Sequence, residues 1–293
     1  MSVLTLETLE SATAGPKPAR LAVIGHPVNH SLSPRMHQPA LDEAGIDARY
    51  VALEVGPGRV AEAFDRMREL GFTGCNVTVP HKFDALEACD QIDDIARDLG
   101  AVNTVRFDDD ATRGTNTDGY GFEHAVKEAL DLDLAGLSVL IVGAGGGAGG
   151  AIAAHCARRG VSRLILANRT IAKAEALVRT LRERHPRIDL AAIGTDDTTL
   201  LTSLAAGCRL LVNTTSLGLR EEDPSPLPPG CLHENHAVFD TIYKPTALLE
   251  AASKVGARHA NGHLMLLHQG VAAFRFWFPD TDPEAAMRRG LLG

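Results

Sequence analysis

The sequence predicts a two-domain α/β protein, on three observations. Short runs of β-branched and aliphatic residues alternate with longer amphipathic segments, which is typical of βα units around a mostly parallel sheet. One such run, at 138–142, leads directly into a glycine-rich turn that opens a further helical segment. The length of 293 residues is enough for two hydrophobic cores of ordinary size.

Composition narrows the class of protein. The chain is 45% hydrophobic and 23% charged, which is typical of a globular protein. The formal net charge of -8 argues against nucleic acid or an anionic membrane as the main partner, and no apolar run approaches the roughly 20 residues of a membrane helix. Five cysteines stand without a CxxC pair, which favours reduced thiols over disulfides or a metal site. We expect a cytoplasmic protein, monomer or homodimer, that binds small molecules and no metal.

The first half predicts a first set of βα units. Residues 1–19 are polar and alanine-rich without a targeting pattern, so we expect a loose extension. Ser33-Pro34 is typical of a helix start, and Gly71 of a helix end. In order, the expected elements are a strand at 21–24, a helix at 33–43, a strand at 50–53, a helix at 60–70, a strand at 74–79 and a helical turn from Pro80.

The second half predicts a second set. Its expected strands are 138–142, 163–167, 188–192, 210–212 and 238–239, and its expected helices are 145–159, 171–183, 199–206, 247–255 and 264–278, with a proline-rich loop at 221–230. We expect a first domain of residues 20–118 with 262–293, and a second of residues 119–261. The last long helix would then cross back to the first domain.

The glycine-rich turn indicates a dinucleotide site. The run Gly143-Ala144-Gly145-Gly146-Gly147-Ala148 follows a strand and opens a helix, with a further strand about 20 residues on. Glycines permit the tight turn and the close approach of backbone to a pyrophosphate, and the helix N-terminus offers free N–H groups. This context predicts a Rossmann-like domain.

The end of the next strand indicates which dinucleotide binds. An NAD site usually carries Asp or Glu there to bind the ribose 2′-hydroxyl. This chain has Ala167-Asn168-Arg169-Thr170, with Lys173 one turn later. Arg169 can stack on adenine and hold a 2′-phosphate, with Lys173 as a second cation. The expected cofactor is NADP.

Polar residues gather in the first half at predicted strand ends. Ser31 and Ser33 follow the first strand, where hydroxyls suit a polyol carboxylate, although a simple helix cap is an equal interpretation. The segments 76–82, 101–104 and 116–122 repeat the pattern with amides, hydroxyls, Lys82 and Asp118. We expect all of these segments in turns.

These motifs resemble those of the shikimate dehydrogenase family, from about Leu21 to Trp277. The matching segments are Gly25-x-Pro-x-x-His30-Ser-x-Ser-Pro34, Asn76-Val-Thr-x-Pro-x-Lys82, Ala101-Val-Asn-Thr104, Asn116-Thr-Asp-Gly119, Gly143-Ala-Gly-Gly146, Asn168-Arg-Thr170, Asn213-x-Thr-x-x-Gly218, Asp240-x-x-Tyr-x-Pro245 and Gly262-x-x-Met-Leu-x-x-Gln269. Any one segment is modest evidence, but nine in the family's order are specific.

The resemblance implies a function and a role for each residue. The chain would reduce 3-dehydroshikimate reversibly to shikimate with NADPH, its first domain binding the substrate. Lys82 and Asp118 would act at the reacting oxygen. The other implied substrate contacts are Ser31 and Ser33 at the carboxylate, Thr78, Asn103 and Gln269 at the ring hydroxyls, and Tyr243 near the carboxylate. Further implied cofactor contacts are Thr214, Ser216, Leu219, Gly262 and Met265.

Three departures from the family pattern bear on the pocket. Gln38 stands where the family usually has Asn, Leu219 where it usually has Met, and the stretch after Tyr243 is about two residues short. The alternatives are a quinate/shikimate dehydrogenase that uses NAD, an aminoshikimate dehydrogenase, and, from another class, a catalytically silent NADP-binding regulator. Retention of both Lys82 and Asp118 argues against the regulator.

Overall fold

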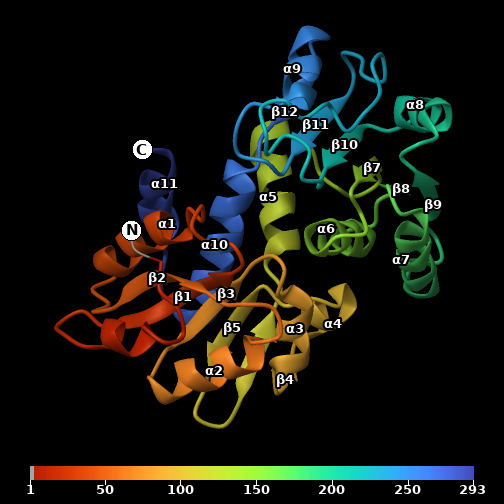
Figure 1. Ribbon diagram of the computed structural model, residues 1–293. Helices are drawn as coiled ribbons and strands as arrows, with labels where there is room; N and C mark the ends of the chain where they lie inside the picture. The colour runs from red at the N-terminus through yellow and green to blue at the C-terminus, as the bar shows by residue number, and fades with distance from the viewer. Residues whose placement is uncertain (1–2) are drawn as a thin grey trace. The chain divides into compact units, whose positions relative to one another are not determined.

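The computed structural model describes residues 3–293, and the chain divides into two compact units. The first unit holds the described residues up to Asp118 together with Leu266–Gly293, and the second holds Gly119–Met265. Figure 1 labels the elements of both. Among the described residues, no helix is long and apolar enough to cross a membrane.

The first unit is built on a six-stranded sheet in the order β2-β1-β3-β5-β6-β4. Helix α10 (His263–Trp277) belongs to this unit from Leu266 onward. The other elements are η1 (Leu9–Thr13), β1 (Ala19–Gly25), α1 (Ser33–Glu43), β2 (Arg49–Glu54), α2 (Val60–Glu69), β3 (Gly74–Val77), α3 (Lys82–Ala88), β4 (Gln91–Ile92), α4 (Asp94–Leu99), β5 (Thr104–Phe107), β6 (Thr112–Thr115) and α11 (Glu284–Leu292).

This sheet is mixed, because a hairpin that the sequence did not predict interrupts the parallel strands. Strand β1 pairs in parallel with β2 and β3, whereas β5 runs antiparallel to both β3 and β6. Asp108 in the hairpin turn accepts hydrogen bonds from Arg106 and Arg113, one on each strand. Expecting all the polar segments in turns was therefore wrong, since Asn76 lies within β3 and Thr104 begins β5.

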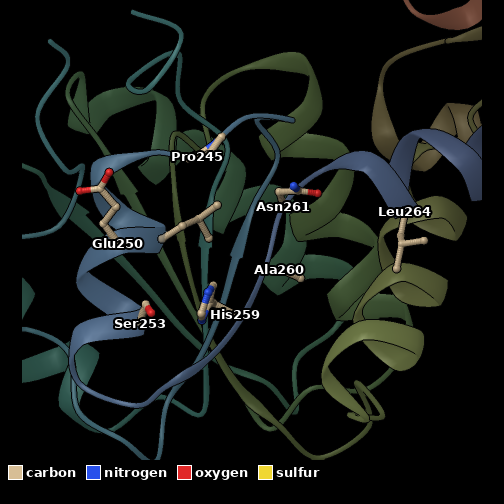
Figure 2. Close-up of a pocket in the computed structure, with 8 residues that line it drawn as sticks. Pro245, Glu250, Ser253, His259, Ala260, Asn261 and Leu264 are labelled. Atoms are coloured by element: carbon tan, nitrogen blue, oxygen red, sulfur yellow. The ribbon is translucent and has the colours of Figure 1, made fainter. Parts of the chain in front are cut away.

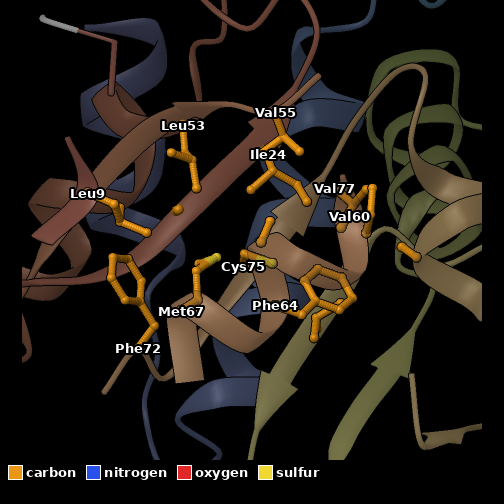
Figure 3. Close-up of a cluster of buried hydrophobic side chains, with 14 of the residues drawn as sticks. Leu9, Ile24, Leu53, Val55, Val60, Phe64, Met67, Phe72, Cys75 and Val77 are labelled. Atoms are coloured by element: carbon orange, nitrogen blue, oxygen red, sulfur yellow. The ribbon is translucent and has the colours of Figure 1, made fainter. Parts of the chain in front are cut away.

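The N-terminal segment differs from the expected loose extension. Leu4 forms a parallel bridge with Leu53 at the edge of β2. Leu6, Leu9 and Ala12 are buried in one core cluster with side chains of β1–β3 and α2, and Figure 3 shows Leu9 facing this group. Leu9 and Ala12 stand three residues apart in η1, which matches the period of a 3-10 helix and places them on one face. The spacing of these apolar residues, which composition alone does not show, indicates that the segment is folded and packed.

The second unit contains an entirely parallel sheet in the order β12-β11-β10-β7-β8-β9. That order is the doubly wound arrangement of dinucleotide-binding domains. Its strands are β7 (Ser138–Val142), β8 (Arg163–Asn168), β9 (Asp189–Gly194), β10 (Leu210–Asn213), β11 (Ala237–Asp240) and β12 (Arg258–Ala260). Its helices are α6 (Gly147–Arg158), α7 (Ile171–Arg184), α8 (Thr198–Ala206) and α9 (Ala247–Lys254), after α5 (Asp118–Leu130), which begins at the last residue of the first unit.

Strand periodicity explains how this sheet is covered. Leu140 and Ile165, from β7 and β8, share a core cluster with Leu201 of α8 and Leu248 of α9. Alternate residues of a strand point to opposite faces of the sheet. The buried residues between those named therefore pack against the helices on the other face. Strands buried on both faces read as continuous apolar runs, which is why the sequence predicted them well.

The five cysteines are free, as the sequence predicted. Burial raises the pKa of Cys89 to about 12 and that of Cys208 and Cys231 to about 11 each. Burial also raises the pKa values of Cys75 and Cys156. All five are therefore neutral thiols near pH 7, without the thiolate that reactive cysteines require.

Candidate functional site

Lys82 and Asp118 form an ion pair in the first unit. The Lys82 Nζ atom lies 2.6 Å from Asp118 Oδ2, and the two side chains are only 12% and 8% exposed. Lys82 is the first residue of α3 and Asp118 the first of α5, so each side chain leaves its helix at the N-terminus. A short pair shielded from water holds a proton donor and an acceptor in fixed positions.

Asn103 completes this pair from the loop before β5. Its side-chain Nδ2 donates to Asp118 Oδ1 at 2.8 Å, while its Oδ1 accepts from the backbone N–H of Thr117 at 2.8 Å. Asp118 therefore accepts hydrogen bonds through both carboxylate oxygens, from an ammonium and from an amide. Gln269 of α10 joins the group through the Thr117 hydroxyl, at 3.5 Å.

Ser31 and Ser33 lie at the start of α1, just after β1. The Ser33 backbone N–H donates to Ser31 Oγ at 3.3 Å, and the Ser33 side chain is buried. The helix-cap interpretation is not supported for α1 itself, because its N-cap residue is Leu32 and makes no side-chain cap bond. Thr78 lies against the last residue of β1, since a Cβ added to Gly25 would stand 2.5 Å from its methyl carbon.

Two histidines stand next to predicted site residues in the sequence, His81 beside Lys82 and His30 beside Ser31. His81 is fully buried beside Lys82, and its Nε2 lies 2.7 Å from the backbone oxygen of Val55, so it fastens the start of α3 to the loop after β2. His30, in the loop before α1, is exposed. The contact of His81 is therefore a structural one.

The glycine-rich turn of the second unit has the shape that a pyrophosphate requires. Gly143 has φ of +92°, which an L side chain rarely adopts. A Cβ at Gly149 would stand 2.5 Å from the Gly143 carbonyl oxygen and 2.6 Å from Thr214 Oγ1. Gly146 is the N-cap of α6 and makes no side-chain cap bond, so the first N–H groups of the helix remain available to an anion.

The residues after β8 lie against this turn and fit a phosphorylated ribose. A Cβ at Gly145 would stand 2.7 Å from Lys173 Cβ and 3.0 Å from Asn168 Nδ2. Asn168 donates to the backbone oxygen of Thr170 at 2.9 Å, which shapes the turn, and Arg169 and Lys173 are exposed. Two cations beside the glycine turn, with no acidic residue at the strand end, suit the 2′-phosphate of NADP.

A buried polar network shapes the loops after β10 and β11. Asn213 donates to Asp240 Oδ1 at 3.0 Å and accepts from the backbone N–H of Thr215 at 2.9 Å. Asp240 Oδ2 accepts from the hydroxyl of Thr246, the N-cap of α9, at 2.7 Å. Burial raises the pKa of Asp240. The sequence singled out both segments by their motifs, and the structure shows that their first residues fasten one loop to the other.

The remaining predicted cofactor residues also belong to the second unit. Thr214 donates to the Val142 carbonyl at 2.8 Å, so it lies at the end of β7 beside the glycine turn. Ser216 and Leu219 are exposed in the loop after β10. Gly262 and Met265 are buried near the start of α10, where a Cβ at Gly262 would stand 2.2 Å from the Thr241 carbonyl oxygen.

Tyr243, the predicted substrate residue of the second unit, is 38% exposed. Its ring lies 5.4 Å from that of His263, and its backbone oxygen accepts from Asn261 Nδ2 at 3.1 Å. The structure thus groups Lys82, Asp118, Asn103 and Gln269 through the contacts above, and Ser31 with Ser33. Tyr243 instead contacts His263 and Asn261, near the predicted cofactor residue Gly262.

Gln38, one of the departures from the family pattern, supports the fold of the first unit. Its Oε1 accepts from the backbone N–H of Tyr50 at 3.0 Å, and its Nε2 donates to Asp42 Oδ1 and to the Ala48 carbonyl. The side chain therefore joins α1 to the start of β2. The glutamine at position 38 therefore stabilises the fold. None of these hydrogen bonds goes to a predicted substrate residue.

A hollow on the second unit lies apart from the predicted residues. Figure 2 shows it between α9 and β12. The described residues that line it are Pro245, Leu249, Glu250, Ser253, His259, Ala260, Asn261 and Leu264. None of these is a predicted site residue, so we assign the hollow no part in the chemistry.

Comparison with known families gives matches in both units. Residues 23–105 match a family described as the shikimate dehydrogenase substrate-binding domain. Residues 124–199 match a family described as shikimate / quinate 5-dehydrogenase. The first match covers Lys82 and Asn103, and the second covers the glycine turn and Arg169.

Individual relatives agree over most of the chain. The chain is 40% identical to shikimate dehydrogenase (NADP(+)) of Methanopyrus kandleri over 93% of its length and 94% of the relative. It is 42% identical to the protein of the same name from Rubrobacter xylanophilus over 93% and 95%. A solved structure of shikimate 5-dehydrogenase from Thermus thermophilus, in complex with NADP(H) and shikimate, is similar with a TM-score of 0.79 and 35% identity, over 93% of this chain and all of that one.

Proposed function

This chain belongs to the shikimate dehydrogenase family, and we propose that it reduces 3-dehydroshikimate reversibly to shikimate with NADPH. The observation that carries the proposal is the shielded Lys82–Asp118 pair with Asn103 on the second carboxylate oxygen. The family supplies the reaction class, and this group is a set of side chains able to serve it. The two compact units then correspond to a substrate-binding domain and a cofactor-binding domain.

The side chains of the first unit would bind and orient the substrate. Ser31 and Ser33 offer hydroxyls to its carboxylate, and Thr78, Asn103 and Gln269 offer hydrogen-bonding groups to its ring hydroxyls. In carbonyl reduction negative charge develops on the substrate oxygen. Lys82 Nζ stabilises that charge and donates a proton to the oxygen, while Asp118 holds the ammonium and accepts from the neighbouring hydroxyl. Tyr243 of the second unit would assist at the carboxylate.

NADP would be held by the second unit, and when bound it supplies or accepts the hydride. The glycine turn Gly143–Ala148 with the α6 N-terminus takes the pyrophosphate. Arg169 and Lys173, with Asn168 and Thr170 in the same turn, take the 2′-phosphate. The residues that would border the nicotinamide half are Thr214, Ser216, Leu219, Gly262 and Met265.

The biological setting follows from the reaction. Shikimate formation is a step toward chorismate and the aromatic amino acids, and we place the enzyme there. Five free cysteines, four of them buried, support a reducing compartment, so we propose the cytoplasm as its location. Monomer and homodimer both remain predictions for its assembly.

The alternatives differ from the proposal in observable ways. A quinate/shikimate dehydrogenase that uses NAD would carry an acidic residue after β8, where this chain has Asn168 and Arg169. An aminoshikimate dehydrogenase would share the same scaffold and differ in one substituent of the substrate. A silent regulator would not need the Lys82–Asp118 pair.

Product analysis tests the proposal. Purified protein is incubated with 3-dehydroshikimate and NADPH, and the product is identified by chromatography against authentic shikimate. We expect one shikimate formed for each NADPH consumed. A folded protein that binds NADPH yet forms no shikimate would favour the regulator.

A further inference from the structure

A chain of buried hydrogen bonds connects Tyr50 of β2 to the Lys82–Asp118 pair. Tyr50 OH lies 2.7 Å from Asn76 Oδ1, and Asn76 Nδ2 lies 3.1 Å from Thr104 Oγ1. Thr104 Oγ1 lies 2.9 Å from Asn103 Oδ1, and Asn103 Nδ2 lies 2.8 Å from Asp118 Oδ1. Its first four members are at most 5% exposed. Since buried polar groups must find partners, each member depends on the next.

The orientation of both amides is fixed by neighbours that have a single hydrogen-bonding role. Asn76 Nδ2 also faces the backbone carbonyl of Asn103 at 3.4 Å, and a carbonyl only accepts. Asn103 Oδ1 faces the backbone N–H of Thr117, which only donates, and Asn103 Nδ2 faces the carboxylate of Asp118. Neither amide can be flipped without opposing donor to donor or acceptor to acceptor.

The direction of the two hydroxyls follows from the amides. The Thr104 hydroxyl receives an N–H from Asn76, and the nearer acceptor for its own hydrogen is Asn103 Oδ1 at 2.9 Å, ahead of Thr117 Oγ1 at 3.4 Å. The Tyr50 hydroxyl faces the oxygen of Asn76, so it must donate. Burial raises the pKa of Tyr50 well above its usual 10.0, which keeps the phenol protonated and able to donate. Every bond of the chain therefore donates toward Asp118.

We propose that Tyr50, Asn76 and Thr104 are positioning residues that turn the Asn103 amide toward Asp118 and thereby hold the catalytic carboxylate in place. This inference rests on the proposed function, because it assigns Asp118 to the reaction. Hydrogen bonds aligned toward a negative charge strengthen one another. A reacting group held this way needs no reorganisation during turnover, and small misplacements are costly.

Thr104 offers the sharpest test, because two substitutions separate its hydroxyl from its volume. Thr104→Val keeps the shape and removes the donor, whereas Thr104→Ser keeps the donor and removes a methyl group. Positioning predicts that Thr104→Val lowers kcat for shikimate oxidation about tenfold or more, with the KM for NADP+ unchanged, and that Thr104→Ser stays within about threefold of the native chain. Kinetic constants are expressed per folded protein, measured by circular dichroism.

A matched control lies in a neighbouring strand of the same unit. Thr112 of β6 is 3% exposed, and its hydroxyl accepts from Arg68, outside the chain of bonds described above. Thr112→Val therefore loses a buried hydroxyl without affecting the hydrogen-bond chain from Tyr50 to Asp118. Its kcat should stay within about twofold of the native value. Tyr50→Phe, which keeps the ring and removes the first donor, should lower kcat in the same direction as Thr104→Val.

The outcomes that would overturn the inference are distinct from failure of the proposed function. If Thr104→Ser were more damaging to kcat than Thr104→Val, Thr104 would act through packing and the inference would be wrong. If the native chain did not turn over shikimate, the proposed function would fail. The hydrogen-bond chain would then be tested by denaturant unfolding. The double variant Tyr50→Phe with Thr104→Val should lose less free energy of unfolding than the sum of the two single losses. Strictly additive losses would overturn the inference.

Discussion

Lys82 donates to Asp118 at 2.6 Å although the two residues begin different helices, α3 and α5. The contact places an ammonium and a carboxylate together in a setting that is about nine-tenths shielded from water. With Asn103 on the other carboxylate oxygen, Asp118 is held through both of its oxygens, which suits the catalytic role we propose for the pair. The predictions below begin with this pair.

Lys82→Ala should lower kcat for shikimate oxidation by about 10²- to 10⁴-fold, the usual contribution of a positioned acid. Binding of NADP+, followed by fluorescence titration, should be unchanged because the residues predicted to bind the cofactor lie in the second unit. Lys127→Ala on α5, whose side chain is 52% exposed, is the matched loss of a lysine and should leave kcat intact. Unchanged turnover in Lys82→Ala would refute the mechanism.

Arg169→Ala should raise the KM for NADP+ about 10- to 100-fold, because a hydrogen bond to a charged group contributes roughly 1.5–3 kcal/mol. The KM for NAD+, which lacks the 2′-phosphate, should change less than about twofold by the same reasoning. Arg184→Ala, an exposed arginine at the far end of α7, controls for the loss of charge. An equal effect on both cofactors would remove Arg169 from 2′-phosphate recognition.

His37 should make the protein sensitive to acid. It is fully buried, stacks on Tyr50 at 4.4 Å between ring centroids, and has no hydrogen-bond partner for either ring nitrogen among the described residues. Burial lowers its pKa from 6.5 to about 3. Below pH 6.5 His37 is protonated in the unfolded chain but stays neutral in the folded one. The contribution of His37 to the free energy of unfolding is therefore complete above pH 6.5 and falls as the pH decreases toward 3.

The expected slope for one such group is about 1.4 kcal/mol per pH unit within that window. Denaturant unfolding at a series of pH values measures it. His37→Phe, which retains an aromatic ring against Tyr50, should reduce the slope by about that amount, whereas the exposed His259→Gln should not. Equal slopes for His37→Phe and the native chain would show that His37 does not control acid unfolding.

Leu9→Ala should lower the free energy of unfolding by about 2–5 kcal/mol, as for other leucines deleted from a core. Leu9 is completely buried with Met67 and Phe72. Glu10→Ala beside it removes only a surface pair with Arg66, in which Glu10 is 71% exposed, and should cost less than about 1 kcal/mol. Similar small losses in both variants would mean that the N-terminal segment contributes little to stability.

The parts of the fold predicted from sequence are those in which local pattern and burial agree. The expected helix at 33–43 coincides with α1, and the expected strand at 138–142 coincides with β7. The β5–β6 hairpin was missed because its strands carry arginine and threonine, and its turn is closed by an aspartate that contacts both strands. Such a pairing is a tertiary contact that strand periodicity does not encode.

The candidate site shows the same division. The glycine turn and Arg169 follow from local chemistry, because strand, turn and helix are consecutive in the chain. Lys82 and Asp118 were singled out only by the order of several motifs. The hydrogen-bond chain that leads to Asp118 was not predicted. Its members Tyr50, Asn76 and Thr104 are 26 and 28 positions apart in sequence. They meet only because β2, β3 and β5 pack together in the folded chain.

The most direct test of the account is a set of initial-rate assays that pairs shikimate or quinate with NADP+ or NAD+. We predict the highest kcat/KM for shikimate with NADP+. It should exceed the value for shikimate with NAD+ by at least about tenfold, since the 2′-phosphate contact alone contributes roughly 1.5–3 kcal/mol. Efficient oxidation of quinate with NAD+ would contradict both the cofactor assignment at Arg169 and the proposed preference for shikimate.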